Sequence, residues 1–141
     1  MRTLLFLAAL GLPVAAIGAA KADGYGDLLL CAELKEPLMD TAVLCTQALN
    51  SGQLNERQVA QALMFRGVIA YRLGAHEDAI DDFSLSVQYD PELADAYYFK
   101  GLAFEALGEQ TRADGQYKNA YFYDPNDTEI AAKMRERALL N

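Results

Sequence analysis

The chain has 141 residues, of which 20 are acidic and 12 are basic, so its formal net charge at pH 7 is −8. Nucleic acids and anionic lipid surfaces repel so acidic a chain, which argues against both as partners and leaves basic or neutral partners open. The chain contains one histidine, two cysteines and no tryptophan, so few side chains are available for metal binding or nucleophilic catalysis.

Residues 1–22 have the composition of a secretory signal peptide. Arg2 supplies a positive charge near the start, and an apolar stretch follows over residues 4–20. Ala20 and Ala22 have the small-x-small spacing that signal peptidase reads, so we expect cleavage after Ala22. An uncleaved anchor is the alternative, although the stretch is short for a membrane span. Cleavage predicts a periplasmic or secreted protein with no stable membrane anchor.

The part that remains after cleavage has 119 residues, enough for one small domain. Its segment 23–53 is expected to form an atypical helical hairpin, with a first helix to about Lys35 and a second from about Leu38. Cys31 and Cys45 then lie level, and export favours a disulfide that closes a fifteen-residue loop. A catalytic redox pair is the alternative, but it lacks C-x-x-C spacing and basic neighbours.

Residues 60–93 and 94–127 repeat each other with an offset of 34 and no gap. Each unit is predicted to form a helix, a turn and a second helix. In the first unit, Asn55 is expected to cap a long first helix. A glycine in the middle of each first helix indicates that another element passes close by, and a Leu-Gly pair ends that helix. Ten positions are identical: Ala60/Ala94, Ala62/Ala96, Phe65/Phe99, Gly67/Gly101, Leu73/Leu107, Gly74/Gly108, Ala79/Ala113, Tyr89/Tyr123, Asp90/Asp124 and Pro91/Pro125.

This pattern resembles the tetratricopeptide-repeat (TPR) family. Three sequence motifs carry the resemblance: A-Y-x-x-G at residues 70–74, A-I-x-x-F at residues 79–83 and D-P at residues 90–91. Residues 44–52 are similar to the second helix of a degenerate first unit in small exported TPR proteins of Gram-negative bacteria. The resemblance implies an all-α fold, a short solenoid of antiparallel helix hairpins.

Two repeats are therefore expected, over residues 54–93 and 94–127, and residues 128–141 are expected to form a capping helix. The cap begins with polar residues, and its apolar residues are spaced to cover the exposed end of a stack. These apolar residues are Ile130, Ala131, Met134, Ala138 and Leu139.

The family geometry implies that the first helices of the units line a concave face. Relatives that bind chaperone tails carry Lys, Arg and Asn there to clamp a terminal carboxylate, whereas this chain carries mostly apolar residues, so we expect no such clamp. The stripe has no partner within its own unit and predicts a groove for an apolar or amphipathic segment. Its predicted partner-binding residues are Met64, Phe65, Val68, Tyr71, Arg72, Tyr98, Phe99, Leu102 and Glu105, and Gln61, Asp95 and Ala106 extend it. Alternatively, the N-terminal hairpin or a second copy of the chain fills the groove.

Four aromatic residues gather near the end of the second repeat. Tyr117 is expected in the core, and Tyr121 and Tyr123 are expected to pack on the capping helix. Phe122 falls where the family usually places a solvated charge, which indicates either a contact site or a residue covered by the cap.

No constellation for catalysis, metal binding or a cofactor is found. His76 is expected to face solvent in a turn, and a lone histidine makes a poor transition-metal site. Asp81 and Asp82 are adjacent and are expected on a solvated helix face. The sequence thus predicts a non-enzymatic adaptor or scaffold of the cell envelope, which docks a segment of an envelope or secretion protein. A carrier of an apolar small molecule or lipid, or a self-associating structural module, is the alternative, and a homo-oligomer remains open.

Overall fold

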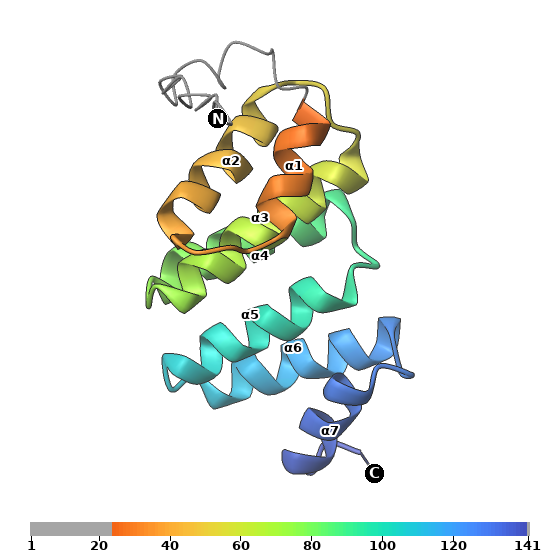
Figure 1. The fold of residues 1–141 in the computed structure, drawn as a ribbon. Helices are drawn as coiled ribbons and strands as arrows, with labels where there is room; N and C mark the ends of the chain where they lie inside the picture. The colour runs from red at the N-terminus through yellow and green to blue at the C-terminus, as the bar shows by residue number, and fades with distance from the viewer. Residues whose placement is uncertain (1–23, 141) are drawn as a thin grey trace, which may run out of the picture.

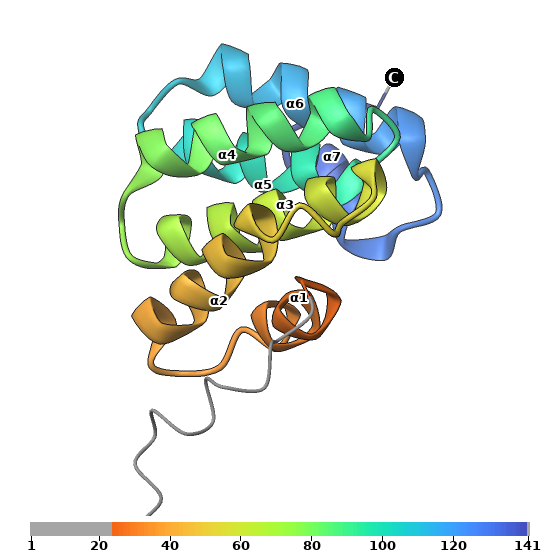
Figure 2. The same ribbon diagram turned by 90° about the horizontal axis from the view of Figure 1, so that it is seen from above.

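The computed structural model describes residues 24–140, and the expected signal peptide and cleavage site lie outside them. The described chain forms helical hairpins that stack from the α1–α2 pair at one end to α7 at the other (Figure 1). Its helices are α1 (Gly24–Ala32), α2 (Leu38–Asn50), α3 (Glu56–Arg72), α4 (His76–Tyr89), α5 (Ala94–Ala106), α6 (Gln110–Tyr123) and α7 (Thr128–Glu136). Seen from above, the α1–α2 hairpin lies on the other side of α3 from α4 and α6 (Figure 2). The predicted all-α solenoid is confirmed.

The helices begin and end at residues whose chemistry suits those positions. The side chain of Asn55 caps α3 by accepting from the backbone N–H of Gln58. The side chain of Gln58 accepts in turn from the backbone N–H of Asn55, which completes a capping box. Gly74 and Gly108 follow α3 and α5 with φ angles of 83° and 78°, a region that disfavours residues with a Cβ. The prolines of the repeated Asp-Pro pairs lie in the connections between the units, outside the helices.

The mid-helix glycines make room for aromatic rings. A Cβ on Gly67 would lie 2.7 Å from the ring of Phe83, and one on Gly101 would lie 2.5 Å from the ring of Tyr117. Both rings are fully buried, so they hold α3 to α4 and α5 to α6. The element that passes close to each glycine is therefore the second helix of the same unit, and it does so through a ring.

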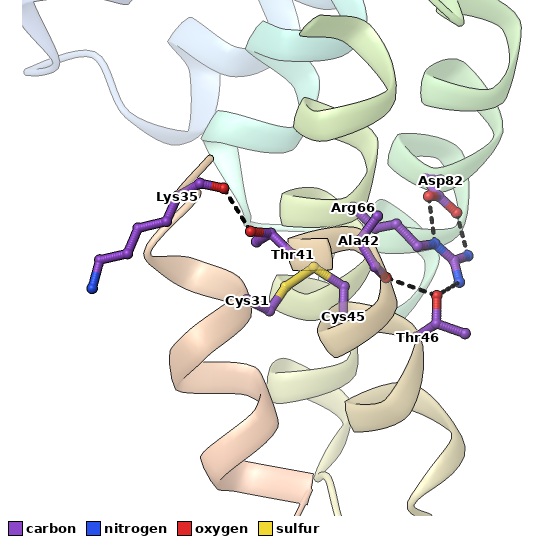
Figure 3. Close-up of a disulfide and its surroundings, with 8 residues drawn as sticks. All are labelled: Cys31, Lys35, Thr41, Ala42, Cys45, Thr46, Arg66 and Asp82. Carbon is purple, nitrogen blue, oxygen red and sulfur yellow. Dashed lines mark hydrogen bonds and ion pairs between the residues drawn. A yellow bond between two sulfur atoms is a disulfide. The ribbon is translucent and has the colours of Figure 1, made fainter. Parts of the chain in front are cut away.

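The first hairpin carries a disulfide between Cys31 in α1 and Cys45 in α2, with the two Cα atoms 4.9 Å apart (Figure 3). Helix α1 ends at Ala32, earlier than expected, because Leu34 takes a left-handed backbone with φ of 47°. Both sulfur-bearing side chains are buried and pack against Ile69 of α3. The disulfide thus lies inside the contact between the hairpin and the first repeat.

An ion pair that the sequence did not reveal joins the two helices of the first repeat. Arg66 donates from Nε and Nη2 to both oxygens of Asp82, at 2.8 and 2.6 Å, and from Nη1 to Oγ1 of Thr46 in α2 at 3.4 Å (Figure 3). The expectation that Asp82 is solvated was wrong, since it is only 8% exposed, whereas Asp81 is exposed. Adjacent helical residues point in different directions, so one reached Arg66 and the other did not.

Helix α7 covers the apolar end of α5 and α6. Asp127 caps it, and Ile130 and Met134 are buried against Tyr98 and Tyr117. The helix ends at Glu136 because Ala138 has a φ of 52°, after which Leu139 folds back onto the same cluster. Between Gly24 and Leu140, no helix has the length and apolar character needed to cross a membrane.

Candidate interaction surface

The stripe on α3 that was expected to line the groove is mostly packed against the next repeat. Met64 and Val68 are each only 6% exposed, and they form one cluster with Ala96 and Ala103 of α5. The prediction from the sequence considered only packing partners within the same repeat. In a solenoid, the first helix of the following unit supplies that partner.

The same holds one unit later for Tyr98, which is 7% exposed and lies in the cluster that α7 completes. Its hydroxyl donates to Oε1 of Glu129 in α7 at 3.0 Å, and its ring lies 5.9 Å from that of Tyr117. Burial, followed by the bond to Glu129, raises the pKa of Tyr98. Three of the predicted groove residues are therefore core residues between units.

Four apolar residues of the predicted groove remain partly accessible: Phe65, Tyr71, Phe99 and Leu102. Leu34, from the turn of the first hairpin, packs onto the cluster around Met64 and Val68. The hairpin thus covers part of the α3 side, as the alternative of self-occlusion anticipated. The half-buried aromatic and aliphatic residues leave an apolar strip along α3 and α5, and ligand contact by these residues stays a prediction.

The two charged residues expected at the rim of the groove have partners within the chain. Arg72 donates to Oε1 of Glu36 at 3.1 Å and to the carbonyl of Leu34 at 3.4 Å. Glu105 accepts a hydrogen bond from the hydroxyl of Tyr117 and lies 3.6 Å from both Lys133 and Arg137 of the cap. These charges fix the hairpin and α7 in place, so neither is free to orient a ligand without giving up a contact.

The α5 end of the concave stripe is acidic. Asp95 is exposed, and its pKa is raised by partial burial and then by the carboxylates of Asp127, Asp124 and Glu129. Among the predicted groove residues the only cation is Arg72, which is paired. A terminal carboxylate would meet negative charge at this end. The absence of a carboxylate clamp stays a prediction.

The four aromatic residues at the end of the second repeat have different environments in the structure. Tyr117 is buried and Tyr121 packs on the α7 cluster, as expected. Tyr123 instead stacks on Tyr97, with ring centroids 5.5 Å apart. Phe122 is 77% exposed and is therefore not covered by the cap.

The histidine of the chain is not solvated as expected. His76 is half-buried at the start of α4, its ring lies 5.3 Å from that of Tyr71, and its buried Nδ1 has no hydrogen-bond partner. Within residues 24–140, no three His, Cys, Asp or Glu side chains are grouped to hold a metal ion. The ring of His76 packs against the ring of Tyr71.

Comparisons with known proteins bear on the fold. No family profile matches the sequence, and no curated protein matches it either. Among solved structures, the Hsp90 co-chaperone Cns1 of Saccharomyces cerevisiae superposes with a TM-score of 0.74 at 18% identity, covering 82% of this chain and 38% of that one. MamA gives 0.71 at 18% identity, covering 89% and 77%, and the first TPR of Spaghetti (RPAP3) bound to an HSP90 peptide gives 0.70 at 20%, covering 83% and 96%. This chain spans little more than a third of Cns1. With its 34-residue hairpins and these structural neighbours, the chain has the tetratricopeptide-repeat fold.

Proposed function

We propose that the chain is a non-enzymatic adaptor that docks a segment of another protein on its concave face. The observation that carries the proposal is the strip of half-buried apolar residues along α3 and α5, namely Phe65, Tyr71, Phe99 and Leu102. Apolar surface that a fold leaves partly in water is stabilised when a partner covers it. The solved first TPR of RPAP3 carries a peptide, which supports a peptide ligand in general.

The preferred segment is amphipathic, with basic rather than acidic residues beside its apolar face. Asp95 is exposed at the α5 end of the strip, and Asp127 and Glu129 lie close enough to raise its pKa. A cation placed there would relieve the repulsion among these carboxylates, whereas an acidic tail would add to it.

The proposed place of action is the cell envelope, and the ligand is a segment of an envelope or secretion protein. Residues 1–22 support export through their charge, apolar stretch and small-x-small end. Intact mass of the protein recovered from the periplasm should correspond to a chain that begins at Asp23. A mass that includes residue 1 would contradict the processing step.

Docking can be tested with two synthetic helical peptides that share a leucine face and carry either lysine or glutamate opposite it. We expect the lysine peptide to bind and the glutamate peptide not to bind, as measured by fluorescence anisotropy. The variant Asp95→Lys/Ala106→Arg changes two exposed positions that flank Phe99 and Leu102 without touching the core. It should weaken binding of the lysine peptide at least about tenfold.

A matched control places the same change of charge on the outer face of α4. Glu77→Lys/Gln88→Arg also alters two exposed residues and shifts the net charge by the same amount. It should bind the lysine peptide nearly as well as the wild type does. Equal loss of binding in both variants would mean that net charge alone attracts the peptide, and the concave face would be rejected as the docking site.

A further inference from the structure

Helix α7 holds the position of a first helix at the C-terminal end of the described stack. Helix α7 follows α5 in the 34-residue register, so Ile130 takes the place that Ala62 and Ala96 hold in the earlier first helices, and all three are buried. In both complete repeats a second helix packs on the first, at the rings of Phe83 and Tyr117. Within the described residues, 137–140 after α7 form no helix, and no second helix packs on α7 as α4 packs on α3.

Large apolar side chains gather beside α7. Phe122 is 77% exposed and Leu140 is 38% exposed, and with Tyr121 and Met134 they line a depression of about 460 Å³. Lys118 lies at the same depression and forms no ion pair within residues 24–140. We call these five residues the tail surface.

The opposite end of the stack is also apolar. On the outer face of α2, Met39 is 62% exposed and Val43 is 53% exposed, and they line a second depression of about 310 Å³. Asp40 lies between them in the sequence, is exposed, and has no ion-pair partner in the described chain. We call Met39, Asp40 and Val43 the head surface, and Figure 1 shows α2 and α7 at opposite ends of the stack.

The charges of the two surfaces are complementary. The tail surface offers the unpaired Lys118, and the head surface offers the unpaired Asp40. Between residues 24 and 50 there are four acidic residues and one basic residue, so two head surfaces repel each other. Solenoid ends ordinarily carry a polar outer face, and both ends of this stack depart from that rule.

We propose that copies of this chain associate head to tail, with the head surface of one copy packed on the tail surface of the next. The contact is heterologous, so it continues from copy to copy and does not close as a symmetric dimer does. The contact leaves the concave strip open, so this inference goes beyond the docking function and can fail independently of it.

Sedimentation velocity on the exported, processed protein tests the association. We expect the mean mass of the wild type to rise with concentration without a plateau at the dimer. Phe122→Glu and Val43→Glu each spoil one end and should raise the apparent dissociation constant at least about tenfold. An equimolar mixture of the two variants should form a dimer that stops there, because each variant keeps one intact end. Leu85→Glu, at an exposed apolar position of α4 away from both surfaces, should associate like the wild type.

Charge reversal separates this contact from other modes of association. Asp40→Lys and Lys118→Glu should each weaken association at low salt. The chain that carries both reversals should recover it, because the new lysine on the head surface of one copy then faces the new glutamate on the tail surface of the next. A wild type that stays monomeric up to about 1 mM overturns the proposal, whether or not another protein occupies the tail surface. So does a closed dimer that Val43→Glu leaves intact.

Discussion

At the scale of single residues, the pair formed by Arg66 and Asp82 links α3 to α4 through two hydrogen bonds. Asp82 is nearly buried, Arg66 is about one third exposed, and the hydrogen bond to the carboxylate raises the pKa of the guanidinium. We expect Asp82→Ala to lower the free energy of unfolding by about 2 kcal/mol, because Arg66 keeps its charge without a partner. Urea denaturation at pH 7 measures the effect.

The neighbouring Asp81 supplies a control for this pair. It is exposed and without an ion pair in the described chain, so Asp81→Ala should change stability by less than about 0.5 kcal/mol. Arg66→Met/Asp82→Leu, which removes both charges, should recover much of the loss. Equal effects of Asp81→Ala and Asp82→Ala would show that the pair contributes little.

Asp95 gives the molecule a dependence on pH. The pKa of Asp95 in the folded state is raised, first by burial and then by Asp127, Asp124 and Glu129. As pH rises, the folded protein therefore keeps the proton of this carboxyl to a higher pH than the unfolded chain does. The associated stability is present below the ordinary aspartate pKa and is lost as pH rises through the raised value. Asp95→Asn should therefore stabilise the fold at pH 7 by a few tenths of a kcal/mol, since exposed charges are screened, and have almost no effect at pH 3. Thermal unfolding at the two pH values gives the comparison, and an equal gain at both would rule out this origin.

At the scale of the elements, the mid-helix glycines separate packing from helix propensity. Gly67 and Gly115 both lie inside helices, but a Cβ on Gly67 would meet the buried ring of Phe83, whereas a Cβ on Gly115 has no neighbour within 4 Å. Gly67→Ala should lower the free energy of unfolding by about 1 to 2 kcal/mol through overpacking. Gly115→Ala should raise it by about 0.5 to 1 kcal/mol, because alanine is the better helix former. Chemical denaturation of the two variants decides, and stabilisation by both would contradict the packing argument.

The elements were predictable from the sequence where local chemistry decides. Asn55 with Gln58, and the glycines after α3 and α5, mark helix ends whatever the neighbours do. The candidate site was not predictable in the same way. Met64 and Tyr98 belong to the stripe that family geometry assigns to the groove, yet neighbouring units bury them. The sequence of one repeat does not reveal the contacts that another repeat makes with it. It also does not reveal the side-chain conformation that brings Asp82 to Arg66.

At the scale of the whole molecule, the disulfide closes the first hairpin by linking α1 to α2. Cys31 and Cys45 are both buried and are separated by 14 positions, and closing a loop of this size stabilises a fold by about 3 kcal/mol in the chain-entropy model. Cys31→Ala/Cys45→Ala should lower the free energy of unfolding by about that amount. Added reductant should destabilise the wild type similarly and leave the variant unchanged. A wild type whose stability ignores reductant would show that the bond contributes nothing.

The two ends of the stack are stabilised in different ways, which sets the order in which they unfold. The α1–α2 hairpin is closed on itself by a disulfide and packs on Ile69 of α3. Helix α7 is held by its apolar side chains and by pairs such as Arg137 with Asp114 and Lys133 with Glu105. Charge pairs near the surface are individually weak and are screened by salt, so the last helix should fray first and more readily at high ionic strength. Reduction opens the closed loop of the α1–α2 hairpin and makes that end easier to unfold. A protease would then attack an oxidised chain from its C-terminal side and a reduced chain from both sides, so the polarity of its breakdown would report the redox state of its surroundings.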